Sequence, residues 1–235
     1  MHRTTLWMIA ACFGVSSCGP GIEITLTGLV NELGGANGLV DAQVCPSELE
    51  PGECVATQAD GTYTIARVRG DSEMSLRVDK EGYLGGAIPV STGSTAQSVP
   101  VISLGSSILV DLQMGILDVD AAEGTGQIAF SISNGINGDG INIADMRVGL
   151  EPSTGAGPFY SNESGLPDPD LDETSANGGG VFVNIPPGLY TLNHLNLPLN
   201  CTPMLGWGNA DALSFEVMAN RVTYVRVECI ETGSP

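Results

Sequence analysis

Basic side chains are scarce in this sequence of 235 residues. It holds 8 Lys and Arg against 27 Asp and Glu, which gives a formal net charge of −19. Such a surface repels the phosphates of nucleic acids and of anionic lipids, which argues against nucleic acid or any other polyanion as the partner. The acidic side chains keep a protein soluble, and they can also attract cations or basic partners.

Histidine is scarcer still. The sequence has 2 histidines, and neither a GxSxG nor an HExxH motif occurs in it. His194 lies far from any serine or cysteine motif, and one imidazole without partners cannot form a catalytic triad. We therefore expect His194 to be a surface or loop histidine. The sequence predicts a protein that is not an enzyme and has no catalytic residues.

The N-terminal apolar run is too short to cross a bilayer. A membrane-spanning helix needs about 20 apolar residues, whereas this run covers residues 6–15. Arg3 precedes the run, and Ser16 and Ser17 follow it. This layout is typical of a secretory signal, so we assign residues 1–17 to a signal peptide.

The segment Val15-Ser16-Ser17-Cys18 resembles the lipobox of bacterial lipoproteins, in which an aliphatic residue and two small ones precede the lipidated cysteine. The resemblance implies cleavage before Cys18 and a lipid anchor on that residue, which would hold the protein on a membrane of the cell envelope. Gly19 after the cysteine gives no inner-membrane retention signal, which by resemblance favours the outer membrane. Ordinary secretion, with Cys18 merely near the cut, is the alternative.

The cysteine count agrees with export. The sequence has 6 cysteines, namely Cys12, Cys18, Cys45, Cys54, Cys201 and Cys229. Cys12 would leave with the signal and Cys18 would carry lipid, so an even number remains for disulfides in an oxidising compartment. Proximity favours the pairs Cys45–Cys54 and Cys201–Cys229, which would stabilise by about 2.7 and 3.6 kcal/mol in the chain-entropy model. A metal site is the competing interpretation, but CxxC spacing and a neighbouring histidine are missing.

Glycine and proline are abundant, with 32 and 14 residues, which is typical of short strands joined by turns. Residues 22–26 alternate between apolar and polar side chains, as a half-buried strand does. Asp60-Gly61 stands before another alternating run and indicates a hairpin. Residues 127–132 repeat the alternation in the C-terminal half. We therefore expect an all-β chain.

The β-rich segments divide the mature chain into a first domain at residues 18–104, a linker at residues 105–124 and a second domain at residues 125–232. Within the linker, residues 106–114 predict a short helix packed between the domains, with Ser106 or Ser107 as N-cap and Gly115 as C-cap. Its apolar face would consist of Ile108, Leu109, Leu112 and Ile116. A strand is the alternative, because SILVDL is also β-prone.

The run Thr-x-x-Asp-Gly-x-Tyr-x-Ile at residues 57–65, with a Gly-Tyr pair some way after it, resembles the carboxypeptidase regulatory-like family. In the first domain the resemblance is carried by Gly28, Asn31, Gly35, Val44, Thr57, Asp60, Gly61, Tyr63, Ile65, Val68, Gly82 and Tyr83. In the second domain it is carried by Gly126, Val148, Thr174, Asn177, Gly178, Phe182, Ile185, Pro186, Pro187, Gly188 and Tyr190. Asn177 there replaces the usual Asp, and the loops are longer.

This resemblance implies two tandem transthyretin-like β-sandwich domains, joined by a segment with a short helix. The family is a non-catalytic module, and some of its relatives share a carbohydrate-binding-like sandwich. A fold by itself does not establish a function. The resemblance therefore predicts architecture and leaves the ligand open.

Two side-chain groups are candidates for ligand binding. The acidic residues Asp168, Asp170 and Asp172 resemble the start of a calcium loop, although Pro169 and the lack of a downstream Gly and Glu break that pattern. A solvated acidic loop is the alternative. Trp207 and Tyr160 could stack on sugar rings, or serve the core as most aromatic residues do.

The sequence as a whole predicts a non-enzymatic, lipid-anchored envelope protein that acts as a binding or scaffolding module. Its partners would be the membrane, through the lipid, and envelope proteins or glycans. The alternatives are a carbohydrate-binding accessory surface protein and a calcium-dependent adhesion module, with Ca²⁺ as the one cofactor to consider.

Overall fold

The computed structural model describes residues 21–35, 37–47, 53–134, 142–197 and 200–230. Within these ranges the protein consists of strands in three sheets and one short helix, which confirms the all-β prediction. None of the described helical segments is long and apolar enough to span a membrane. Residues 1–17 and Cys18, with the predicted signal and lipid site, lie outside the described residues.

The first sheet contains β1 (Glu23–Glu32), β4 (Thr62–Arg69), β7 (Gln97–Ser98) and β8 (Ile102–Leu104). β1 pairs antiparallel with β4 and parallel with β7 and β8. The Asp60-Gly61 turn before β4 is formed: Asp60 Oδ1 accepts a hydrogen bond from the Thr62 backbone N–H at 3.0 Å, and Gly61 has a φ of 81°. The hairpin that we predicted there is wrong, because β4 pairs with β1, whereas residues 55–56 before the turn belong to another sheet. A Cβ on Gly61 would lie 2.4 Å from the Val30 carbonyl oxygen, so only glycine fits there.

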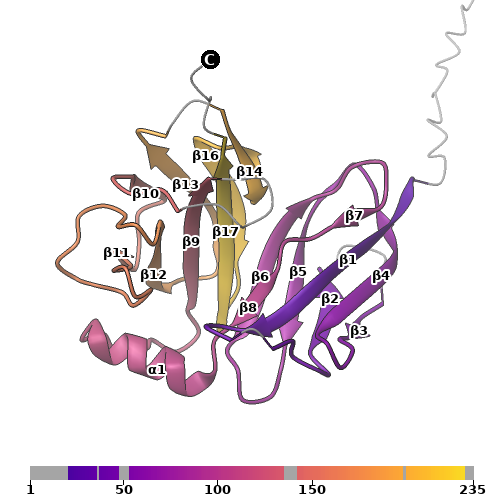
Figure 1. Ribbon diagram of the computed structural model, residues 1–235, viewed down its shortest axis with the longest axis horizontal. Coiled ribbons are helices and arrows are strands. Elements are labelled where there is room, and N and C mark those ends of the chain that lie inside the picture. Colours follow the sequence, from indigo (N-terminus) through magenta and orange to yellow (C-terminus); the bar gives the residue numbers. More distant parts are fainter. Residues whose placement is uncertain (1–20, 36, 48–52, 135–141, 198–199, 231–235) are drawn as a thin grey trace, which may run out of the picture.

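The second and longest sheet runs through both halves of the chain, in the order β11-β12-β9-β17-β6-β5-β2-β3, with β14 also beside β17. Its strands are β2 (Gln43–Pro46), β3 (Val55–Ala56), β5 (Glu73–Asp79), β6 (Gly85–Ser91), β9 (Gly126–Asn134), β11 (Ala156–Tyr160), β12 (Gly179–Ile185), β14 (Cys201–Leu205) and β17 (Arg221–Cys229). β17 pairs in parallel with β9 on one side and with the start of β6 on the other (Figure 1). This one strand therefore joins the N-terminal and C-terminal halves into a continuous sheet.

The third sheet contains β10 (Arg147–Glu151), β13 (Gly188–Leu195), β15 (Trp207–Asn209) and β16 (Ala212–Val217), in the order β10-β13-β16-β15. It packs on the C-terminal part of the long sheet. Phe215 of β16 is fully buried there, in one cluster with Ile128 and Ile132 of β9.

The two hydrophobic cores lie on opposite faces of the long sheet. Successive side chains of a strand point to opposite faces. Along β17, Tyr224 packs against the first core, whereas Val225 and Val227 belong to the second. A Cβ on Gly86 of β6 would lie 3.4 Å from the Tyr224 ring, so both residues share the first-core face. The halves thus form two sandwiches that use one sheet, and the boundaries 18–104 and 125–232 stay a prediction.

The predicted linker helix exists as α1 (Ser107–Ile116), and Ser106 is its N-cap, with Oγ accepting from the Leu109 N–H at 3.4 Å. The predicted packing face is wrong. Ile108, Leu112 and Ile116 are 82%, 57% and 38% exposed. The opposite side is buried instead, through Met114 and Leu117, which cluster with Val183 of β12 and with apolar side chains of β11.

The predicted C-cap of this helix is also wrong. Gly115 lies inside the last turn, and Leu117 is the C-cap residue. Both errors have one cause: α1 carries apolar residues on almost every side, so the periodicity of the sequence does not show which side faces the protein.

Candidate functional site

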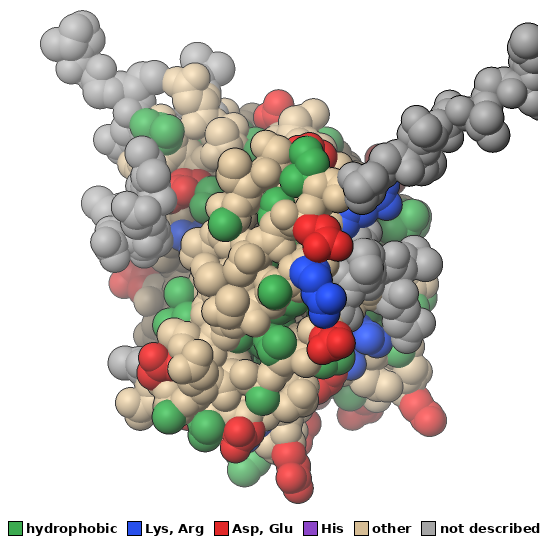
Figure 2. Space-filling model, turned by 90° about the vertical axis from the view of Figure 1, so that its right-hand side faces the viewer, with side chains coloured by type: hydrophobic (Ala, Val, Ile, Leu, Met, Phe, Trp, Pro, Cys, Tyr) green, Lys and Arg blue, Asp and Glu red, His purple; other side chains and the backbone are tan. Residues whose placement is uncertain are grey.

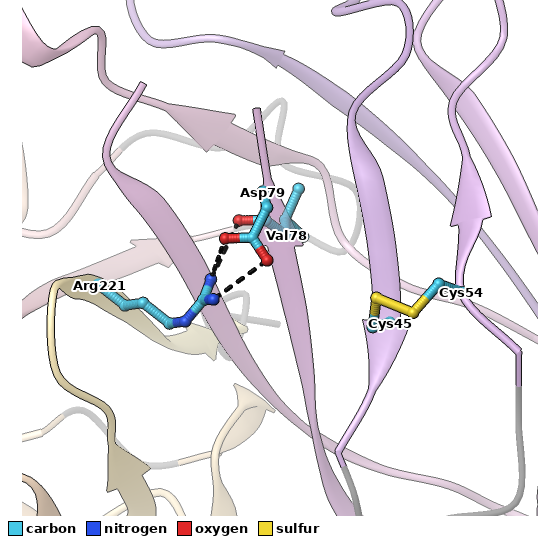
Figure 3. The surroundings of a disulfide bond; sticks show 5 residues. All are labelled: Cys45, Cys54, Val78, Asp79 and Arg221. Atoms are coloured by element: carbon cyan, nitrogen blue, oxygen red, sulfur yellow. Dashed lines mark hydrogen bonds and ion pairs between the residues drawn. A yellow bond between two sulfur atoms is a disulfide. The ribbon is translucent and has the colours of Figure 1, made fainter. Parts of the chain in front are cut away.

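The junction between the two halves is held first by an ion pair. Arg221 at the start of β17 donates from Nη1 and Nη2 to Oδ1 and Oδ2 of Asp79 on β5, at 2.6 and 3.0 Å (Figure 3). Nη1 also reaches the Val78 carbonyl oxygen at 3.5 Å. The Arg221 side chain is 18% exposed and that of Asp79 is 51% exposed. A bidentate pair of this kind fixes the relative orientation of the two side chains as well as the distance between them.

We expect this ion pair to couple the halves modestly. Because the Asp79 carboxylate is half exposed and screened by water, a double-mutant cycle with Arg221→Ala and Asp79→Ala should give a coupling of about 1 kcal/mol. The coupling, measured by denaturant unfolding, should fall as salt rises from 0.05 to about 0.5 M, because salt screens exposed charges. A coupling that does not change with salt would show that the pair acts through packing alone.

Residues 205–207, where β14 ends and β15 begins, make the second set of junction contacts. Leu205 is 4% exposed and belongs to the first core, although it lies in the C-terminal half of the chain. The Gly206 N–H donates to the Pro89 carbonyl oxygen at 3.0 Å, and Trp207 Nε1 donates to the Val90 carbonyl oxygen at 3.2 Å. The Trp207 indole, which we singled out for sugar stacking, therefore holds β15 to β6.

A groove lies along the junction, on the first-core face of the long sheet. Two adjoining cavities of about 250 and 260 Å³ share Leu33, Ala129, Phe130, Ser131 and Tyr224 as lining residues. Val110 and Gln113 of α1 line one of them, and Val101 and Ser103, at β8, line the other. The groove lies between β8 of the first sheet and α1, over the part of β9 that carries the small side chains of Ala129 and Ser131.

The groove is almost free of charge. Among the described residues that line it, Arg226 is the only charged one, and its Nη2 donates to Ser133 Oγ at 3.1 Å. Burial raises the pKa of Tyr224 well above its ordinary range, and a hydrogen bond with the Gly105 backbone opposes this only in part. The phenol is therefore neutral. Such a lining suits apolar and neutral polar groups of a partner, not acid–base chemistry.

Both predicted disulfides are present. Cys45–Cys54 ties β2 to the chain just before β3 (Figure 3), and Cys201–Cys229 ties β14 to the end of β17. The second bond links residues that are direct partners across the two strands. Covalent links at these positions fit a protein exported to an oxidising compartment.

The three predicted calcium ligands do not converge. Asp168 Oδ1 accepts a hydrogen bond from the Asp170 N–H at 3.0 Å, which closes a local turn, while Asp170 and Asp172 are exposed. Nowhere in the described ranges do three or more His, Cys, Asp or Glu side chains come close enough to hold a metal ion. The loop has the form of the solvated acidic loop that we gave as the alternative.

Tyr160 lies in the second core. It is 3% exposed, its ring meets that of Phe130 edge-on with centroids 5.9 Å apart, and its hydroxyl oxygen accepts from the Val148 N–H at 3.0 Å. A side chain enclosed in this way cannot stack on a sugar, so Tyr160 is a core residue.

His194 is not the surface or loop histidine that we predicted. It is only 6% exposed, on β13 and next to the second core, and burial lowers its pKa to about 4. The Ala210 backbone and the Asp211 carboxylate pull the pKa upward but do not balance the burial. The alternation of Tyr190, Leu192 and His194, all buried, is the sequence signal that could have located it.

Comparisons with known proteins find only low similarity. No protein-family model matches the chain, and no curated protein matches it. The minor pilin GBS52 of Streptococcus agalactiae aligns with 12% identity and a TM-score of 0.33, covering 90% of this chain and 97% of the pilin. The shaft pilin SpaA of Lactobacillus rhamnosus GG aligns with 10% identity and a TM-score of 0.25, covering 89% and 98%.

The TIE protein of Bacillus anthracis aligns with 14% identity and a TM-score of 0.26, covering 88% of this chain and 34% of that protein. TM-scores and identities this low assign neither a fold family nor a function. The functional argument therefore depends on the junction itself.

Proposed function

We propose that the protein is a non-enzymatic, lipid-anchored component of the cell envelope that acts as a binding or scaffolding module. The observation that carries this proposal is the junction. β17 shares one sheet with both halves, and Arg221 and Trp207 fasten the halves to each other. A scaffold needs two surfaces at a fixed separation, and a shared sheet with side-chain contacts across the junction would hold them so.

The groove and the processing signal support the same function. The groove offers a mostly apolar surface at the junction, where the shared sheet joins both halves and a binding site would keep its shape. The lipobox-like sequence before Cys18 would place this surface at a membrane, and we propose the outer membrane. The resemblance to carboxypeptidase regulatory-like domains also indicates a non-catalytic module.

Cys18→Ser tests the anchor. Several acyl chains, each CH₂ contributing about 0.8 kcal/mol, hold a protein firmly on a bilayer. We therefore expect the unchanged protein in the membrane fraction of cells and the Cys18→Ser variant in the soluble fraction or as an uncleaved precursor. Mass spectrometry of the mature N-terminus should find lipid on Cys18. An unmodified Cys18, or a membrane fraction that the substitution leaves unchanged, would contradict the proposal.

A photo-cross-linking residue in the groove tests the binding function. Placed at Ser103, it should give a discrete adduct with one envelope protein in living cells. The matched control is Thr64, an exposed residue of β4 on the first sheet, where the same cross-linker should give no such adduct. The absence of any adduct from groove positions, with the protein present at its normal level, would refute a binding role for the groove.

A further inference from the structure

Helix α1 presents an apolar stripe that nothing in the described protein covers. Ile108, Leu112 and Ile116 are spaced four residues apart, so they lie along one side of the helix. Their exposed fractions are 82%, 57% and 38%. Single exposed apolar residues are common on protein surfaces, but a contiguous row of them marks an interaction surface. We call these three residues the α1 stripe.

The orientation of the α1 stripe is fixed by the other side of the helix. Met114 is 6% exposed and Leu117 is 7% exposed, and both pack with Val183 of β12. The Ser107 N–H donates to the Gly82 carbonyl oxygen at 3.0 Å, which fastens the start of the helix to the loop before β6. The helix therefore cannot roll to bury the stripe without losing these contacts.

Acidic residues lie on α1 and directly after it. No Lys or Arg occurs anywhere in residues 81–146. Asp111 lies on the helix itself, and Asp118, Asp120 and Glu123 follow directly after it, all four of them exposed. An apolar row with exposed acidic residues beside it is complementary to a segment that combines apolar and basic residues.

The side of the molecule that lies away from α1 has a different distribution of hydrophobic and charged side chains. The face drawn in Figure 2 lies away from α1, and its hydrophobic side chains stand as isolated spots among neutral atoms. Acidic and basic groups alternate along one strip of that face. This face therefore does not combine a hydrophobic row with one sign of charge.

Two other occupants fit the stripe poorly. A bilayer with anionic lipids would be repelled by the acidic residues on and after α1, and the start of β1, toward which an anchor on Cys18 leads, lies at the far end of the molecule from α1 (Figure 1). A second copy would bring the same acidic residues against themselves.

We propose that the α1 stripe docks a cationic amphipathic segment of another envelope protein, a helix whose apolar residues lie on the stripe and whose flanking lysines or arginines face the acidic residues on and after α1. This inference goes beyond the groove and rests on the proposed function, because it gives the binding module a second surface and names the class of partner for that surface. The mode is helix-against-helix recognition through residues spaced three and four apart. The acidic residues would supply steering and orientation, and the stripe would supply the apolar contact.

Isothermal titration calorimetry of the full chain with a synthetic peptide tests this docking proposal directly. The probe is an 18-residue helix of leucine and lysine with all leucines on one face, and the control peptide has the same composition scrambled so that no apolar face forms. We expect the amphipathic peptide to bind at least tenfold more tightly than the scrambled one. Equal binding of the two would show charge attraction alone and would overturn the proposal.

Substitutions then locate the binding surface. Ile108→Ser with Leu112→Ser should weaken binding of the amphipathic peptide at least tenfold. Asp118→Asn with Asp120→Asn should weaken it and flatten its dependence on salt. Leu189→Ser is the matched control, since Leu189 is 72% exposed on β13, outside the stripe, and it should leave binding unchanged. All of these positions are exposed, so circular dichroism should show intact folds.

Further outcomes would also overturn the proposal: unchanged affinity in the stripe variant, flotation with phosphatidylglycerol vesicles that depends on the stripe, or stripe-dependent dimers in sedimentation. Failure here is separable from failure of the proposed function. The peptide assay does not depend on lipid at Cys18, and the cross-linking and fractionation experiments do not involve the stripe.

Discussion

Thr223→Pro is expected to unfold both halves of the molecule together. Thr223 has no exposed surface and sits in β17, where it is the partner of Ile128 in β9 and of Ala87 in β6. Proline removes the backbone donor of a central strand and crowds the neighbouring strands, so it is tolerated almost only at sheet edges. The loss should reach about 3 kcal/mol or more, out of a typical total stability of about 5–15 kcal/mol.

Hydrogen exchange measured by mass spectrometry checks this prediction, because it follows each half separately. Peptides from β5 in the first half and from β12 in the second should lose protection together. The control is Thr223→Val, which keeps the backbone N–H and loses only the bond from Thr223 Oγ1 to the Glu216 carbonyl oxygen at 3.1 Å. It should cost about 1 kcal/mol. Loss of protection in one half alone would mean that the halves fold independently.

Acidification is expected to destabilise the protein through His194. The pKa of His194 is about 4 in the folded protein, against an ordinary value of 6.5, so the unfolded chain binds more protons between these values. The stability linked to His194 is fully present above pH 6.5, falls as the pH drops toward 4, and changes no further below that. The shift corresponds to a loss of about 3 kcal/mol.

The substitution His194→Gln isolates this effect. Glutamine does not titrate, so the variant should lack the part of the pH dependence that comes from the imidazole, while every carboxylate still titrates as before. Denaturant unfolding at several pH values between 4 and 7.5 should show the free energies of unfolding of the two proteins converging as the pH falls. Parallel curves for the two proteins would refute the role assigned to His194.

Local features of this fold could be predicted from the sequence. The Asp60-Gly61 turn, the strand at β9 and both disulfides each depend on a few neighbouring residues or on cysteine spacing, and all of them are present. The existence of α1 could also be predicted from the sequence, because Ser106 begins a periodic apolar run. Short-range alternation and capping carry this information directly.

Long-range features could not be predicted. The parallel pairing of β17 with β6 joins segments far apart in the chain, and parallel pairs leave no turn between them that a sequence could reveal. The Arg221–Asp79 pair and the contact of Trp207 with Val90 follow from that pairing, so they could not be predicted either. The buried side of α1 was ambiguous because the helix is apolar nearly all round.

The position of β17 has a consequence for the order in which the protein folds. Until β17 arrives, the edges of β6 and β9 have no partner on the side that it will occupy, and unpaired edges invite association with other chains. Contacts between distant parts of a chain form slowly because a long loop must close first. During synthesis and export, the edge of β6 in the first half therefore stays unpaired until β17, at the end of the second half, has emerged. A carrier that shields this edge until the whole chain has emerged would raise the yield of folded protein.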